Sequence, residues 1–232
     1  MKWVSRTHIG NVRSSNQDTL IIGSSVYGVA DGMGGHRGGD VASHMAATEL
    51  LSLLGDKEPS EEGLREAVKL VNTAIYNRQL NEPELSGMGT TLTVLWESEN
   101  ALLLAHVGDS RAYLLHEGAL RQISEDHSLV GEMLRNGVLS KEAAAHHPYK
   151  NMITRAVGTD PLVEVDCLTL PKEQGDVWLL CSDGLSNYIP DSELQETLTL
   201  HTLEEAADLL LRAALDRGGQ DNITLVIAEV AP

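Results

Sequence analysis

Four apolar stretches that each adjoin an aspartate place the strongest constraint on the fold of this chain. The aspartates are Asp31 after 26–30, Asp109 after 105–108, Asp183 after 177–182, and Asp221 before 223–227. Stretches this short and apolar have the length of buried strands. After 26–30, the step Asp31-Gly32 predicts a turn that admits a positive φ and ends the strand. Carboxylates at strand ends this far apart in sequence predict one shared, oxygen-rich site.

Such a site suits divalent cations and phosphate chemistry. Mg²⁺ and Mn²⁺ prefer carboxylate, carbonyl and water ligands, and glycines beside three of the four aspartates leave backbone carbonyls accessible. Two such cations can share a carboxylate, activate a water and neutralise the charge that develops during hydrolysis of a phosphate ester. Arg13 is the natural partner for phosphoryl oxygens, because guanidinium is a bidentate and permanently charged donor. Taken singly, each aspartate is more often a turn or cap residue and Arg13 a surface ion-pair residue.

Other phosphate chemistries lack their motifs. A cysteine phosphatase needs Arg six residues after the nucleophile, but the positions after Cys167 and Cys181 hold Glu173 and Asn187. The sequence has no Asp-x-Asp pair, no Gly-x-x-x-x-Gly-Lys loop and no His-Glu-x-x-His zinc motif. A covalent nucleophile therefore has no candidate, and metal-activated water remains. We expect both cysteines to be small buried hydrophobic residues of a reducing compartment, with a cross-strand disulfide as the less favoured alternative.

Charge excludes several partners. The chain has 34 acidic and 17 basic residues, a formal net charge of -17. This surplus argues against general nucleic-acid binding and against docking on anionic membranes. Residues 1–6 contain no apolar signal-peptide segment, and no apolar run reaches the length of a membrane span. We expect a cytoplasmic protein.

Periodicity predicts an α+β domain in which antiparallel strands are grouped between helices. Expected helices follow Asp40 as a cap and end at Gly55, follow Ser60, follow Asp191, and run from the capping box Thr202–Glu205 to Gly218. Expected strands after residue 88 are Thr90–Trp96, Ala101–Val107, Arg111–Leu115, Val163–Leu170, Val177–Cys181 and Ile223–Val230. Residues 125–160 change character, with short helices at Leu129–Leu134 and after Ser140 and a break at His146–Tyr149.

Seven motifs stand in order between about residues 6 and 230: Arg13-x-x-Asn16-Gln17-Asp18, Val29-Ala30-Asp31-Gly32-Met33-Gly34-Gly35-His36, Gly89-Thr90-Thr91, Val107-Gly108-Asp109-Ser110-Arg111, Arg155-Ala156-Val157-Gly158, Leu180-Cys181-Ser182-Asp183-Gly184 and Gly219-x-Asp221-Asn222-Ile223-Thr224. With this set the chain resembles the PPM family of metal-dependent (type-2C-like) serine/threonine protein phosphatases, specifically its compact bacterial members. The resemblance implies an α-β-β-α sandwich of two antiparallel β-sheets flanked by helices. It also implies one phosphatase domain over residues 1–232, with a flap insertion at about 137–160.

The resemblance also implies roles for individual residues. Two Mn²⁺ or Mg²⁺ ions would be tightly bound, with a third bound more weakly. Asp31 would bridge the two ions, Gly32 would offer its carbonyl to one ion, and Asp183 and Asp221 would complete the ligand shell of the other. Asp109 with Asp183 would hold the third ion. Asp18 would act through a metal-bound water, and Arg13 would bind the substrate phosphate. Two positions depart from the common pattern: Gln17 replaces Glu, and Met33 replaces the His that eukaryotic members use as a proposed general acid. His36 is a nearby candidate acid, and equally a polar loop residue.

The sequence therefore predicts a phosphoprotein phosphatase that acts on phosphoserine and phosphothreonine, as a monomer, and opposes a bacterial Ser/Thr kinase and its targets. The alternative is a catalytically silent module that binds phosphoproteins or metals, for which Gln17 is the only hint. A two-metal nuclease is disfavoured by the acidic balance.

Overall fold

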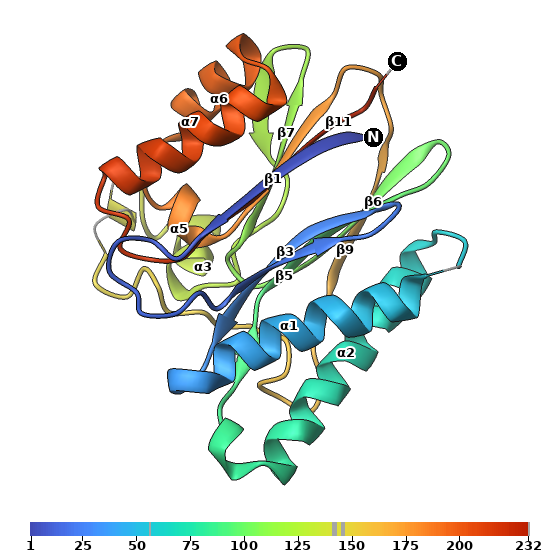
Figure 1. Cartoon of the computed structure of the whole chain (residues 1–232), viewed down its shortest axis with the longest axis vertical. Coiled ribbons are helices and arrows are strands. Elements are labelled where there is room, and N and C mark those ends of the chain that lie inside the picture. Colours follow the sequence, from blue (N-terminus) through green and yellow to red (C-terminus); the bar gives the residue numbers. More distant parts are fainter. Residues whose placement is uncertain (56, 141–142, 145–146, 232) are drawn as a thin grey trace.

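The computed structural model of the chain describes residues 1–55, 57–140, 143–144 and 147–231, with only the backbone of residues 35–37. Two antiparallel sheets lie face to face between two layers of helices (Figure 1). This is the predicted α-β-β-α sandwich, so the expected fold class is confirmed.

The first sheet has the strand order β1-β11-β10-β7-β8. Its strands are β1 (Lys2–His8), β11 (Ile223–Glu229), β10 (Val177–Cys181), β7 (Arg111–His116) and β8 (Ala119–Gln122). The central strand β10 is buried throughout, which explains its unbroken apolar run. Pairing of β1 with β11 places the two ends of the chain side by side.

The second sheet has the order β2-β3-β5-β6-β9. Its strands are β2 (Asp18–Ile22), β3 (Val26–Met33), β5 (Leu92–Glu97), β6 (Ala101–Val107) and β9 (Asp166–Pro171), and the short β4 (Gly89–Thr90) pairs with the end of β3. The central strands β5 and β6 are buried along nearly their whole length. The aspartates predicted to share a site lie in or beside strands of both sheets, so the packing of the two sheets decides how these aspartates lie.

Helices cover both outer faces. Figure 1 shows α1 (Gly35–Leu54) and α2 (Glu61–Asn81) on the second sheet, and α6 (Asp191–Leu200) and α7 (Leu203–Asp216) on the first. Shorter helices are η1 (Pro83–Leu85), α3 (Leu129–Arg135) and α5 (Asp183–Ser186). Ser60 caps α2, and Thr202 with Glu205 forms the predicted capping box of α7.

Apolar side chains form three layers of core, as a four-layer sandwich requires. Leu50, Val68 and Trp96 belong to the cluster between the second sheet and its helices. Trp178 and Val226 belong to the cluster between the two sheets. The third cluster, which includes Leu179, Leu210 and Leu225, joins the first sheet to α6 and α7.

The start of α1 corrects two predictions. Asp40 does not cap this helix, which begins five residues earlier, after Gly34 with φ 118°. The Asp31-Gly32 step does not end its strand either, because β3 continues to Met33. The physical reason is the contact between helix and strand: a Cβ on Gly32 would lie 2.0 Å from the carbonyl oxygen of Gly39. Glycine at this position serves close packing, and the turn that needs positive φ comes two residues later, at Gly34.

Smaller corrections concern strand ends and cysteines. β9 begins at Asp166, three residues later than predicted, and the predicted strand Thr90–Trp96 is two strands interrupted at Thr91. Cys167 and Cys181 are free and lie in different sheets, so the disulfide alternative is wrong. The helix predicted after Ser140 and the break at His146 lie partly outside the described residues, as does the side chain of His36. None of the helices in the described ranges is long and apolar enough to cross a bilayer.

Candidate active site

The predicted aspartates come together where strands of the two sheets end. Asp18 begins β2 and lies opposite Asp31 of β3 in the strand register. Asp183 begins α5 directly after β10, and Asp221 lies two residues before β11. Asp109 lies in the turn between β6 and β7. Arg13, in the loop between β1 and β2, donates from Nη2 to Oδ2 of Asp221 over 2.7 Å.

The structure brings these groups close enough for each charge to act on its neighbours. Burial raises the pKa of Asp31 well above its usual range, and the charges of Asp18, Asp183, Asp109 and Asp221 raise it further. Burial followed by the charges of Asp221 and Asp18 raises the pKa of Asp183 to about 7. Five carboxylates that repel one another in a desolvated setting form an arrangement that favours a bound cation.

Asp18 and Asp109, the other two carboxylates, also have raised pKa values. Burial raises the pKa of Asp109 to about 8, with a further contribution from the charge of Asp183. Burial also raises the pKa of Asp18 to about 6, although Ser182 donates to its Oδ2 over 2.8 Å. The other carboxylate oxygen of Asp18, Oδ1, is buried and has no hydrogen-bond partner in the described part of the chain. An unpartnered buried oxygen needs a donor or a cation.

The residues present therefore fit divalent cations, and protein donors occupy one oxygen each of Asp183 and Asp221. Nδ2 of Asn187 donates to Oδ2 of Asp183 over 3.0 Å, and Arg13 binds Asp221. Among the residues that the structure describes, no group of three or more His, Cys, Asp or Glu side chains stands preformed as a metal-binding cluster. Hard carboxylate oxygens gathered at one place match the donor set of Mg²⁺ or Mn²⁺.

Backbone contacts fix the central aspartate. The N–H of Asp31 donates to Oγ1 of Thr91 over 2.9 Å, and its carbonyl accepts from the N–H of Thr91 over 2.8 Å. Oγ1 of Thr91 also lies 2.8 Å from Oγ of Ser110 and hydrogen-bonds to it. Thr91 thus connects the strand that carries Asp31 with the turn that carries Asp109. The sequence contained Thr91 in a recognised motif but gave no reason to assign it this contact.

Comparison with known proteins identifies the family. The sequence profile of the family described as Protein phosphatase 2C matches residues 7–219. The chain belongs to this family. The finding confirms the resemblance drawn from the seven motifs, and the protein is a serine/threonine protein phosphatase.

A curated relative and solved structures agree with this assignment. The serine/threonine phosphatase Stp of Listeria monocytogenes is 44% identical over 236 residues, which cover 97% of this chain and 94% of the relative. The crystal structure of the serine/threonine phosphatase PstP of Mycobacterium tuberculosis superposes with a TM-score of 0.94 at 39% identity, covering 100% of this chain and 99% of the other. A structure of the PstP catalytic domain in complex with 2 manganese ions has a TM-score of 0.92 at 38% identity, covering 100% and 98%.

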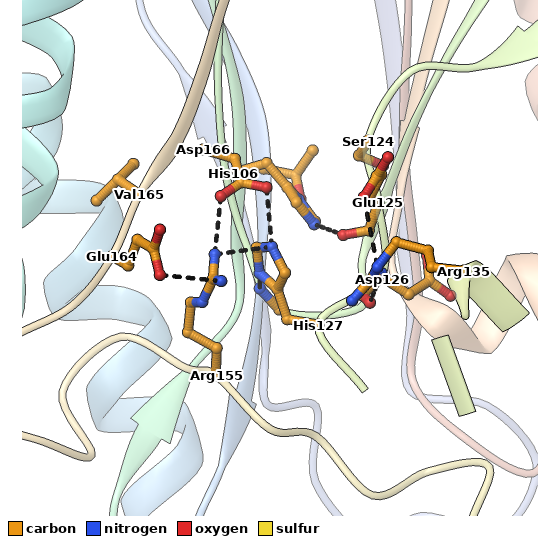
Figure 2. Close-up of polar contacts among 12 residues, drawn as sticks. His106, Ser124, Glu125, Asp126, His127, Arg135, Arg155, Glu164, Val165 and Asp166 are labelled. Atoms are coloured by element: carbon orange, nitrogen blue, oxygen red, sulfur yellow. Dashed lines mark hydrogen bonds and ion pairs between the residues drawn. The ribbon is translucent and has the colours of Figure 1, made fainter. Parts of the chain in front are cut away.

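A second polar cluster in this phosphatase was missed by the sequence reasoning (Figure 2). The rings of His106 and His127 lie 4.8 Å apart between centroids, and both side chains are buried. Asp166 lies between His127 and Arg155, with contacts of 3.0 Å to Nε2 of His127 and 2.8 Å to Nη1 of Arg155. The sequence signals are the position of His106 inside an otherwise apolar strand and the presence of Arg155 in one of the seven motifs, and neither indicates this contact.

A pocket of about 550 Å³ opens beside Asp109 and Asp183 of the phosphatase. Val130 and Leu134 of α3 and Ile189 line the pocket with apolar side chains. The predicted flap region contributes as well, through Ala144 and Lys150. The pocket therefore joins the carboxylate cluster to the segment that the sequence predicted to be a flap.

Proposed function

We propose that this phosphatase hydrolyses phosphoserine and phosphothreonine in proteins at a binuclear Mn²⁺ or Mg²⁺ centre. The metal ligands would be the side chains of Asp31, Asp183 and Asp221 and the carbonyl of Gly32. Asp109 with Asp183 would hold a third, weaker ion. The observation that carries the proposal is the gathering of Asp31, Asp183 and Asp221 with Asp18 and Asp109, in which burial and the neighbouring carboxylates raise the pKa of Asp31 and of Asp183. The binding of 2 manganese ions by the PstP catalytic domain supports the choice of cofactor.

When bound, the divalent cations supply positive charge that activates a water for attack on phosphorus and neutralises the leaving oxygen. The remaining work belongs to the side chains. Arg13 has 53% of its side chain exposed, so its guanidinium can leave Asp221 and bind two phosphoryl oxygens. Asp18 keeps one buried oxygen unpartnered and the other on Ser182. Asp18 is therefore placed to accept a hydrogen bond from a water inside the site.

The chemistry also defines what must act before this enzyme. Phosphoserine and phosphothreonine in proteins are made by transfer of a phosphoryl group to a hydroxyl, the reaction of a protein kinase. We place this phosphatase opposite a Ser/Thr kinase whose products are its substrates. The segment at about 137–160, which borders the pocket beside Asp183, would act as the flap that contacts those substrates.

Phosphate release from a phosphothreonine peptide tests the proposal. Wild-type protein is assayed with Mn²⁺ and with excess EDTA, beside Asp183→Asn and the control Asp216→Asn, which changes an exposed aspartate at the end of α7. We expect turnover only with Mn²⁺, a loss of more than about 100-fold in Asp183→Asn, and no change in the control. Turnover that persists in EDTA or in Asp183→Asn would refute the assigned centre.

A further inference from the structure

His127 is bonded to both backbone polar groups of Gly108, the residue before Asp109. The N–H of His127 donates to the carbonyl of Gly108 over 2.7 Å. The N–H of Gly108 donates to ring Nδ1 of His127 over 3.0 Å. His127 is 4% exposed, so both bonds are shielded from water. Backbone and ring of one residue therefore hold the peptide that leads into a proposed metal ligand.

These bonds determine the protonation state of the ring. Because Nδ1 accepts from Gly108, the ring proton lies on Nε2, and Nε2–H donates to Oδ2 of Asp166 over 3.0 Å (Figure 2). Arg155 Nη1 also lies 2.9 Å from Nε2, but two N–H groups do not bond to each other, and Arg155 donates instead to Oδ1 of Asp166. Burial lowers the pKa of His127, which agrees with a neutral ring.

Gly108 depends on such external bonds. Its φ is 113°, in the left-handed region, and a Cβ would lie 2.6 Å from Cβ of Thr91. Only glycine fits here, and glycine has the greatest backbone freedom of any residue. No side chain at this position can restrain the turn, so the N–H and carbonyl are its points of attachment. The direction of the Asp109 side chain follows from the conformation that these two groups fix.

We propose that His127, in the tautomer held by Asp166, is a positioning residue that fixes Gly108 and thereby orients Asp109 toward Asp183 for cation binding. The inference rests on the proposed function, because it concerns the third ion. His127 also accepts a hydrogen bond at its carbonyl from the N–H of Thr154 over 2.8 Å. The same residue thus attaches Thr154, in the predicted flap segment, to the Asp109 turn.

Two substitutions separate the functions of the ring nitrogens. In His127→Asn, the amide oxygen takes the place of Nδ1 and can accept from Gly108, but nothing reaches Asp166. In His127→Gln, the amide reaches toward Asp166 and nothing accepts from Gly108. His116→Asn is the matched control, because His116 forms a similar pair with buried Asp176 over 2.7 Å in another part of the protein. Manganese binding is measured by titration of metal-free protein with Mn²⁺, with free Mn²⁺ detected by electron paramagnetic resonance.

We expect His127→Gln to weaken the weakest manganese site about 10-fold, the size of effect typical when a group that orients a metal ligand is removed. In His127→Asn the affinity of this site for manganese should stay within about 3-fold of wild type, and in His116→Asn it should equal that of wild type. In metal-free protein, the Gly108 amide should exchange with solvent faster in His127→Gln than in His127→Asn. This second readout does not depend on metal or turnover.

Asp166→Ala provides a test that leaves the His127 side chain itself unchanged and removes only its partner at Nε2, at a position where 42% of the side chain is exposed. It should weaken the same site about 3-fold in wild type and have no further effect in His127→Asn, which no longer uses Asp166. Unchanged manganese binding in both His127→Gln and Asp166→Ala would overturn the inference. Equal losses in His127→Asn and His127→Gln would also overturn it, since they would show a purely structural role. Failure of wild type to bind manganese would instead refute the proposed function.

Discussion

Two clusters of ionisable side chains lie near each other in this phosphatase and are built in opposite ways. In the carboxylate cluster, neighbouring charges raise the pKa of Asp31, and one oxygen of Asp18 has no partner among the described residues. In the histidine cluster, both ring nitrogens of His106 are bonded, to Thr93 over 2.9 Å and to the carbonyl of Glu125 over 3.0 Å. The ring nitrogens of His127 are bonded as well.

The difference separates a binding site from a scaffold. Carboxylates that repel one another in a desolvated setting destabilise the fold until a cation is bound. Histidines with complete hydrogen bonds make the local structure rigid without any ligand. Burial alone does not distinguish the two clusters, since Asp18 and Asp109 are buried in one and His106 and His127 in the other. Whether the hydrogen bonds and charges are satisfied inside the protein is what distinguishes them.

The largest expected effect is on the carboxylate side, in Asp31→Asn. Activity on a phosphothreonine peptide should fall more than about 100-fold, because the proposed bridging ligand is lost. In EDTA the same variant should be more stable than wild type by about 1 kcal/mol, since a repelled buried carboxylate is removed. Urea unfolding in EDTA checks this. Lower stability in Asp31→Asn would contradict the view that the metal-free cluster is strained.

The second effect is on the histidine side and has the opposite sign. His106→Leu should destabilise the protein by about 2 kcal/mol at pH 7, because Thr93 and the carbonyl of Glu125 lose their partner. Urea unfolding of metal-free protein measures this difference. Stability equal to or above that of wild type would mean that the two hydrogen bonds of His106 do not stabilise the fold.

Acidification should reduce this second effect. Burial, with a smaller contribution from the charge of His127, lowers the pKa of His106 to about 4 in the folded protein. The unfolded chain takes up the proton first, near pH 6.5. The stability that depends on neutral His106 is therefore complete above about pH 6.5 and lost toward pH 4, a loss of up to about 3 kcal/mol. The difference between wild type and His106→Leu should shrink across this range, and a constant difference would show that His106 does not titrate as expected.

The smallest effect separates binding from stability at the edge of the carboxylate cluster. Arg13→Ala should lower kcat/KM about 10-fold, because a phosphoryl contact is lost. Its stability should stay within about 1 kcal/mol of wild type, since 53% of the Arg13 side chain is exposed and solvent screens the pair with Asp221. Arg212→Ala, which changes an exposed arginine on α7, serves as the control for the assay. A large loss of stability in Arg13→Ala would make this residue part of the scaffold.

Much of the fold and of the carboxylate cluster could be predicted from sequence, because the signals are local. A short apolar run with an aspartate at its end is recognisable by itself, and the structure brings Asp18, Asp31, Asp109, Asp183 and Asp221 together. Their roles as ligands, and that of Arg13 in phosphate binding, stay predictions. The capping box at Thr202 was also local and is confirmed.

What could not be predicted depends on contacts between distant segments. Asp31-Gly32 has the pattern of a turn, but close packing with Gly39 keeps Gly32 in the strand. His106, His127 and Asp166 have no common spacing, and their contact arises only when β6, the segment before α3 and β9 are in place. Tertiary packing therefore overrode local rules at the start of α1 and created a cluster that no local rule describes.

The pairing of β1 with β11 has a consequence for the synthesis of the enzyme on the ribosome. Arg13 meets Asp221 across 208 residues of sequence, and Asp221 directly precedes the strand that completes the first sheet. Synthesis proceeds from the N-terminus at about 5–20 residues per second, so Asp221 becomes available some ten seconds or more after Arg13. A nascent chain that ends before Asp221 holds the other four carboxylates but cannot complete the cluster. Hydrolytic capacity therefore appears only once synthesis has passed β11.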